Sequence, residues 1–409
     1  MLLSACKSSR ELRRIVRDIP AAHTRVFPLF VPNPQRPIPE IAACRHEFRL
    51  PYVFAVTDNF PISVTDTKRN AVAEAAVPAR SQRTDDRLSR IIRVLSANAT
   101  IVVSGTKLAQ EIGTRRSEIW RLVQQLRSLG LDIAGHPATG YQLVKIPDLP
   151  LPDVLASPLS ATVFAGKVHH YFRVPSTNSE AMQAAAAGAP EGTVFLAEEQ
   201  TAGRGRGGHS WSSPPSSGIY CSAILRPALA PADAIALSMM SGIAAAIAVE
   251  QVTNVKPDLR WPNDLLIDDK KFCGILTEMN AEITRVRYAV VGIGVNVNQA
   301  EFPPDLASIA TSLRIQTGYS CSRVQLTAAL LQSLDREYCA LTSRNVAEAR
   351  ADIFRRFEQR SSYARGKRVQ VEEDGGYEGV TAGLDERGFL RVETSTGLRT
   401  VLSGGVRPI

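Results

Sequence analysis

Residues 203–211 read Gly-Arg-Gly-Arg-Gly-Gly-His-Ser-Trp, the most informative stretch of this 409-residue chain. Four glycines let a backbone approach a ligand closely and adopt positive φ angles that a Cβ would hinder. Arg204 and Arg206 add permanent cations whose forked donors suit phosphate or carboxylate. Trp211 adds an aromatic surface for a flat ligand. The stretch predicts a loop that closes over an anionic intermediate, and a solvated surface turn is the alternative.

The spacing Gly203-x-Gly205-x-x-Gly208 also matches the dinucleotide-binding fingerprint, but its surroundings do not. Trp-Ser-Ser-Pro-Pro follows where a helix should begin, and no acidic residue occurs before Asp233. A Walker loop is also missing from the sequence. Any bound nucleotide is therefore expected to lie in neither of the two standard phosphate-binding loops.

Further motifs flank the glycine loop, the name used below for residues 203–211. In chain order, the motifs are Ser176-Thr177-Asn178, Glu199-Gln200 just before the loop, Arg-Trp-Pro-Asn-Asp-Leu-Leu at 260–266, Lys-Lys-Phe-Cys-Gly-Ile-Leu-Thr-Glu at 270–278 and Gly-Ile-Gly-Val-Asn-Val-Asn at 292–298. Each motif alone is a weak signal. Together and in this order they resemble the landmarks of the biotin–protein ligases. His209 and Arg260 depart from that pattern, because close relatives more often carry a further basic residue and a lysine there.

Composition and length describe an ordinary globular protein. The chain is long enough for two or three cores, with 44% hydrophobic and 22% charged residues. No run of 18 apolar residues occurs, so no membrane association is expected. The six scattered cysteines lack zinc-binding spacing, and Leu3-Ser4-Ala5-Cys6 lacks the flanks of a secretion signal. We therefore expect free thiols and a cytoplasmic protein.

The net charge of +8 is unevenly distributed. Residues 1–85 carry 13 basic and 8 acidic side chains, residues 86–147 carry 9 and 4, and residues 148–409 carry 26 and 28. A basic module before a nearly neutral body indicates nucleic-acid binding attached to small-molecule chemistry. Residues 1–84 contain nine prolines without clear periodicity. They predict a weakly ordered N-terminal extension.

Residues 85–147 are predicted to form a winged helix-turn-helix domain. Apolar residues recur at helical spacing in three segments, residues 88–95, 108–112 and 119–129. Ser104 and Thr114 are placed to cap the second and third helices. Ile133 and residues 141–143 indicate a two-stranded wing. In the family, a wing of this kind belongs to members that also repress biotin synthesis genes.

The third predicted helix carries basic and amide side chains beside its apolar stripe. These are Arg115, Arg116, Arg121, Gln124 and Arg127. As a recognition helix it would place them against phosphates and bases of operator DNA. A merely solvated basic face is the alternative.

Residues 157–355 are predicted to form an α+β domain with a mixed sheet. Helices are expected at 181–187 and 235–252, and strands at 193–197, 218–225, 272–278 and 286–297. The resemblance implies that this is the class II synthetase-like catalytic domain. Short β-type runs separated by glycines at 362–409 predict a small barrel, SH3-like in the family. The expected strands there are 367–371, 379–384, 390–393 and 399–402.

The resemblance implies a two-step reaction. Biotin attacks the α-phosphate of ATP to give biotinyl-5′-AMP and pyrophosphate, and a lysine of the biotin carboxyl carrier protein of acetyl-CoA carboxylase then displaces AMP. The first step brings two anions together and needs cations and Mg²⁺, whereas the second needs water kept out. The implied enzyme is a biotin–[acetyl-CoA-carboxylase] ligase that also acts as a biotin-responsive repressor. The resemblance further implies a homodimer.

Site residues carry over from the matching motifs. The catalytic residues implied are Lys271, Arg204 and Arg206. The biotin-binding residues implied are Ser176, Thr177, Asn178, Gln200, Arg204, Gly205, Arg206, Lys271 and Gly274. The ATP- or adenylate-binding residues implied are Trp211, Asn263, Asp264, Gly294 and Asn296, with Asp264 as a magnesium ligand. Hydroxyl and amide groups suit a ureido ring, which has two N–H donors and one carbonyl.

Structural alternatives remain for several of these residues. Ser176 could be a plain helix N-cap, Trp211 a core side chain, and Asn263 and Asp264 turn caps. Lys271 could be a solvated lysine at a strand edge.

Three other functions compete with the repressor-ligase. A lipoate ligase should lack the glycine loop and the Trp-Pro-Asn-Asp segment. A biotin sensor without ligase activity would not need Lys271 and both loop arginines. A ligase whose DNA-binding module only tunes affinity is not excluded by the sequence.

Overall fold

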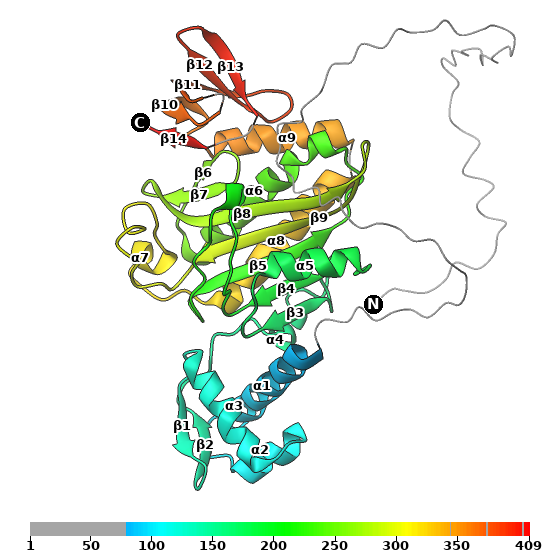
Figure 1. Ribbon diagram of the computed structural model, residues 1–409, viewed down its shortest axis with the longest axis vertical. Helices are drawn as coiled ribbons and strands as arrows, with labels where there is room; N and C mark the ends of the chain where they lie inside the picture. Colours follow the sequence, from blue (N-terminus) through cyan, green and yellow to red (C-terminus); the bar gives the residue numbers. More distant parts are fainter. Residues whose placement is uncertain (1–78, 344, 374, 403–404) are drawn as a thin grey trace, which may run out of the picture. The chain divides into compact units, whose positions relative to one another are not determined.

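The computed structural model describes residues 79–343, 345–373, 375–402 and 405–409 (Figure 1). The expected N-terminal extension, residues 1–84, lies mostly outside the described residues. Its last six residues belong to helix α1 (Ala79–Ala97), so the helical module begins earlier than the predicted boundary at 85.

The N-terminal module contains three helices and a hairpin. After α1 come α2 (Gly105–Ile112), α3 (Arg116–Ser128) and the antiparallel strands β1 (Ile133–His136) and β2 (Gly140–Leu143). The Ser104 side chain caps α2 by accepting a hydrogen bond from the Lys107 amide at 3.1 Å, as predicted. The predicted Thr114 cap is wrong. The Thr114 amide instead returns to the Ala109 carbonyl to complete the end of α2, and the N-cap position of α3 is Arg115.

The central domain is built on a seven-stranded sheet in the order β3-β4-β5-β9-β8-β7-β6. The strands are β3 (Val168–Tyr171), β4 (Val194–Ala197), β5 (Gly218–Leu225), β6 (Asp258–Arg260), β7 (Asp264–Ile267), β8 (Lys270–Ala281) and β9 (Val286–Asn296). Only β3 and β4 run parallel, so the predicted mixed sheet is confirmed. The sequence-based strands did not include β3, β6 and β7, which are three or four residues long. So short a run shows little period-2 alternation.

Helices cover both faces of this sheet (Figure 1). Helix α5 (Thr177–Ala186) packs on one face, where Phe195 and Val290 point. Helices α6 (Ile235–Thr253), α8 (Arg323–Ser343) and α9 (Val346–Gln359) share a larger core with the other face. By length and composition α6 could cross a membrane, but most of it is buried within this core. Short helices are α4 (Pro152–Ala156), α7 (Leu313–Thr317) and the 3₁₀ turns η1 (Arg206–Gly208) and η2 (Pro231–Asp233).

The C-terminal strands form a five-stranded antiparallel sheet in the order β13-β12-β11-β10-β14. They are β10 (Arg365–Val371), β11 (Tyr377–Leu384), β12 (Leu390–Thr394), β13 (Gly397–Val401) and β14 (Val406–Pro408). Four of the five were predicted, and β14 was not. The Trp261 indole of the central domain donates a hydrogen bond to the Gly388 carbonyl at 2.9 Å. This contact attaches the Trp-Pro-Asn-Asp segment to the C-terminal sheet.

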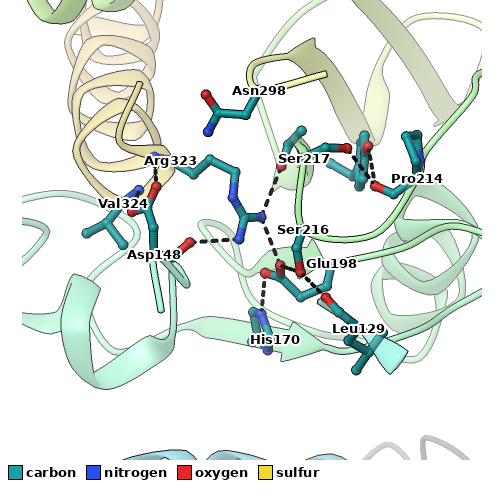
Figure 2. A network of polar contacts seen from close by, with 12 residues as sticks. Leu129, Asp148, His170, Glu198, Pro214, Ser216, Ser217, Asn298, Arg323 and Val324 are labelled. Atoms are coloured by element: carbon teal, nitrogen blue, oxygen red, sulfur yellow. Dashed lines mark hydrogen bonds and ion pairs between the residues drawn. The ribbon is translucent and has the colours of Figure 1, made fainter. Parts of the chain in front are cut away.

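A buried polar network links α8, β3 and β4 to the end of α3 (Figure 2). The Glu198 carboxylate pairs with Arg323 at 2.8 Å and with the His170 ring at 3.0 Å. The Ser216 hydroxyl lies 2.7 Å from the Leu129 carbonyl, to which it donates, and 3.3 Å from Glu198. Burial alone would raise the pKa of Glu198, but Arg323 and His170 hold it below its usual range. Arg323 also donates to the Asp148 carbonyl at 2.7 Å. We call these residues the Glu198 network.

Candidate active site

A cleft opens where the glycine loop, the start of α5 and strands β5, β8 and β9 meet. The sequence-predicted residues that line it are Ser176, Thr177, Asn178, Gln200, Arg204, Gly205, Arg206, Trp211, Asn263, Lys271, Gly274 and Gly294. Every residue expected to bind biotin is therefore at the cleft, although the residues come from motifs far apart in the chain. Asp264 and Asn296 do not line it.

Part of the cleft lining consists of uncharged hydrogen-bonding groups. The Thr177 amide and hydroxyl donate to the Gln200 side-chain oxygen at 2.9 and 3.1 Å. The Gln200 amide group donates to the Ser213 hydroxyl at 2.8 Å. Ser222, not singled out in the sequence, lies with its hydroxyl 2.8 Å from the Thr177 hydroxyl and 2.6 Å from the Asn178 side-chain oxygen. These contacts hold donors and acceptors in place without introducing a charge.

Ser176 occupies the N-cap position of α5, but its side chain makes no capping hydrogen bond. Ser176 is therefore the N-cap residue by position, but its side chain does not cap the helix. The side chain is almost completely buried and lines the cleft.

The glycine loop closes on itself beside the cleft. The Trp211 amide donates to the Gly203 carbonyl at 2.9 Å, and the Gly205 amide donates to the His209 carbonyl at 2.7 Å. Gly207 and Gly208 have φ angles of 65° and 81°, which favour glycine. Glycine thus occupies the two positions of the turn that require a positive φ angle.

The two loop arginines have different partners. Arg204 donates to the Glu278 carboxylate at 2.8 Å, and the Asn178 amide donates to the same oxygen at 2.9 Å. Arg206 donates to the Asn263 side-chain oxygen at 3.3 Å. Glu278 was not assigned a role from the sequence. Strand alternation could have found it, because Gly274, which lines the cleft, and Glu278 are four residues apart on β8 and share a face.

Lys271 is held by an acidic partner. Its ammonium lies 2.6 Å from one Asp264 oxygen, and Arg260 lies 2.7 Å from the other. Burial would raise the pKa of Asp264, but Lys271 and Arg260 together hold it below the usual range. The carboxylate therefore stays ionised and orients Lys271, whose side chain remains 30% exposed.

Trp211 lies over the two glycines of the paired strands β8 and β9. A Cβ at Gly294 would come within 2.6 Å of the indole, and one at Gly274 within 3.0 Å. The Lys271 ammonium is 5.4 Å from the indole ring centroid. Gly294, which lines the cleft, also makes room for Trp211. The buried indole Nε1 has no hydrogen-bond partner among the described residues.

Asn296 does not line the cleft. Its side-chain amide donates to the Thr311 carbonyl at 3.1 Å, and its oxygen accepts from Gln299 at 3.2 Å. It therefore secures the segment that follows β9. Cys221 lines the cleft, but burial raises the pKa of its thiol to about 12, so the thiol remains protonated.

The part of the chain that the structure describes does not fit a resident metal ion. Within it, no three or more His, Cys, Asp or Glu side chains are grouped in a way that could bind one. The Asp264 carboxylate, expected to bind magnesium, already has two cationic partners.

Comparison with known proteins agrees with this architecture. Three family models match in order: an HTH domain at residues 87–142, the Biotin/lipoate A/B protein ligase family at 172–296 and the Biotin protein ligase C terminal domain at 365–406. The class is thus a protein ligase with an added helix-turn-helix domain.

Individual relatives narrow the assignment. The bifunctional ligase/repressor BirA of Bacillus subtilis is 31% identical over 77% of this chain and 97% of its own length. A biotin–[acetyl-CoA-carboxylase] ligase of Mycobacterium tuberculosis is 34% identical over 56% of this chain and 84% of its own. The Aquifex aeolicus biotin protein ligase in complex with biotin and ATP superposes with a TM-score of 0.52 at 27% identity, covering 60% of this chain and 100% of the other. The chain therefore belongs to the biotin ligase/repressor family.

Proposed function

We propose that this protein is an ATP-dependent biotin–protein ligase acting on the carrier protein of acetyl-CoA carboxylase. The observation that carries the proposal is that Lys271, Arg204 and Arg206 share one cleft with the uncharged Ser176, Thr177 and Gln200 group. A ligand that carries both a neutral polar ring and a carboxylate matches this combination of groups.

The proposed chemistry uses the cleft as follows. Thr177 and Gln200 bind the ureido ring, and Lys271 with Arg206 attracts the carboxylate and the α-phosphate. A carboxylate oxygen attacks phosphorus, the bond to the β-phosphate bridging oxygen breaks, and pyrophosphate leaves with the electron pair. The cations offset charge that builds up on the phosphoryl oxygens.

In the second step a carrier lysine attacks the acyl carbon of the mixed anhydride. The bond between that carbon and the phosphate oxygen breaks, AMP leaves, and the amine releases a proton to solvent. Closure of the glycine loop keeps water from competing with the lysine. Trp211 would pack beside the adenine, with Asn263 at its polar edge.

Magnesium would enter with the phosphates of ATP, where it supplies positive charge. Asp264 would act on Lys271 rather than on the ion. Asn296 would secure the end of β9, and Gly294 would leave room for Trp211.

Incubation with biotin and ATP labelled at the α-phosphate tests the ligase. Labelled biotinyl-AMP should form, and the label should leave as AMP when a carrier protein is added. The absence of an adenylate would refute the enzyme assignment. Adenylate without transfer to the carrier would refute only the proposed acceptor.

We also propose that the protein represses biotin synthesis genes in the cytoplasm, as a homodimer on operator DNA. The HTH match, the basic residues of 86–147 and the family support this function. The proposed domains are 85–147 (winged helix-turn-helix), 157–355 (class II synthetase-like catalytic domain) and 362–409 (SH3-like barrel), with α1 extending the first of them to 79. Arg115, Arg116, Arg121 and Gln124 are the proposed DNA contacts.

Retardation of the protein's own biotin-operon promoter tests repression. The shift should require biotin and ATP and should be lost at high salt. A protein that forms the adenylate but never retards this DNA would be a ligase whose module only tunes affinity.

A further inference from the structure

Trp120 has a large apolar surface in solvent on helix α3. Half of its surface is exposed, whereas Ile119, Leu122 and Val123 of the same helix are fully buried. An indole left in water forgoes the free energy of burial, so the side chain is available to a partner of the module. The fold of the module does not need this side chain where it lies.

The residues around Trp120 are basic or amide-bearing. Arg116 and Gln124 lie one turn before and after it, and Arg121 is adjacent. The Arg116 guanidinium donates to the Pro137 carbonyl in the β1–β2 turn, and Arg121 pairs with Glu118 at 2.6 Å. These contacts hold the two arginines on the same helix as the exposed Trp120.

Charge identifies the occupant of this surface. Residues 86–147 carry nine basic and four acidic side chains. This excess of positive charge favours a polyanion over a positively charged or an apolar protein partner. Trp120 is the fifth residue of α3, within the N-terminal part that faces base edges when such a helix enters a major groove.

The chemical groups of the indole match one of the four bases better than the others. The ring offers an apolar face and a single N–H donor with no acceptor. Thymine alone presents a methyl group beside an acceptor, O4, in the major groove. We propose that Trp120 is a specificity-determining residue that contacts the methyl edge of a thymine in the operator. The inference rests on the proposed DNA binding and adds the base that the helix recognises.

Thymine-to-deoxyuridine exchange tests this contact, because it removes only the methyl group. The full-length protein with biotin and ATP would first select tight-binding duplexes from a random pool. Each thymine of a selected duplex is then replaced singly. We expect about a fourfold loss of affinity at the contacted thymine, the value for one buried methyl-sized group.

Substitutions of Trp120 test the same contact from the side of the protein. Trp120→Ala should weaken binding to the selected duplex about tenfold or more and abolish the thymine-versus-deoxyuridine difference at that position. Trp120→Phe should retain the difference, because the ring remains. Val144→Ala, which truncates another exposed apolar side chain of the module, should change neither quantity. Adenylate formation by Trp120→Ala should stay within twofold of the parent, which shows that the central domain is folded.

Four results would overturn the proposal. Trp120→Ala could bind the selected duplex with unchanged affinity, or it could keep the fourfold methyl effect. Alternatively, Trp120→Ala could change the sedimentation of the protein and leave DNA affinity intact, which would assign Trp120 to a protein interface. If the parent protein selects no duplex at all while it still makes the adenylate, the DNA function itself fails, and Trp120 loses its role with it.

Discussion

The central cleft and the Glu198 network both pair cations with carboxylates, but they differ in exposure. In the cleft, the Arg204 and Lys271 side chains are 45% and 30% exposed beside their acidic partners. In the network, the Arg323 and Glu198 side chains are 4% and 0% exposed. Ion pairs of the same kind thus lie in solvent-exposed surroundings in the cleft and in buried surroundings in the Glu198 network.

This difference indicates two purposes for similar pairs. A half-exposed cation can exchange a protein carboxylate for an anionic ligand at small cost, because water and the ligand replace the lost contact. A buried pair has no such substitute, since either charge left alone lacks solvation. The cleft is therefore suited to exchanging partners, and the Glu198 network to holding β3, β4, α8 and the end of α3 together.

Breaking the buried pair should have the largest effect. Arg323→Ala leaves Glu198 charged and without its strongest partner, so the free energy of unfolding should fall by about 3–5 kcal/mol. Denaturant titration measures this loss. Arg355→Ala, which breaks an exposed pair with Asp352, should cost less than about 1 kcal/mol. Equal losses for both variants would contradict the comparison.

Removing the cleft cation should affect the reaction and spare the fold. Lys271→Ala should lower the rate of adenylate formation about 10²–10³-fold, as expected when a group that stabilises developing charge is lost. Lys270→Ala is the matched control, because the adjacent ammonium instead donates to the Ala307 carbonyl. Rates come from single-turnover assays and stability from melting curves. Near-normal turnover of Lys271→Ala would place the catalytic cation elsewhere.

The buried carboxyl of Asp85 should make the stability of the protein depend on pH. Burial raises the pKa of this carboxyl to about 6, although it accepts a hydrogen bond from the Phe172 amide and lies near His170. Because the folded value exceeds the unfolded one of 3.8, its stabilising contribution is present below about pH 4 and is lost as the pH rises to 6.

Asp85→Asn should therefore stabilise the protein by up to about 2–3 kcal/mol at pH 7 and have little effect at pH 4. Thermal unfolding at both pH values measures the difference. A gain of equal size at pH 4 would show that charge is not the cause.

The smallest effect should come from the Arg204–Glu278 pair. Glu278→Gln removes the carboxylate that competes with a ligand for Arg204, so affinity for biotinyl-AMP should rise by up to about fivefold. Glu282→Gln, at an exposed pair beyond the end of β8, is the control and should change nothing. Isothermal titration with the adenylate gives both values. Weaker binding by Glu278→Gln would mean that Glu278 instead orients Arg204 for the ligand.

Several local features of the site could be predicted from the sequence. The glycine loop, the Ser104 cap and the long strands β5, β8 and β9 follow from glycine spacing, capping chemistry and apolar runs, all of which act within a few residues. The partners of the site residues could not be predicted this way. Asn296 bonds to Thr311, Ser222 to Thr177, and Trp211 packs over Gly294 because distant strands and loops come together.

The sequence by itself determined the order of the domains, the long elements and the chemical groups available to the cleft, because these depend on short-range patterns of burial, capping and backbone freedom. Only the tertiary structure decided which charge meets which partner and in what environment. Arg204 reaches Glu278 across 74 positions and Ser216 reaches Leu129 across 87. The strength of such contacts depends on distance and local dielectric, and both are set only when the elements pack.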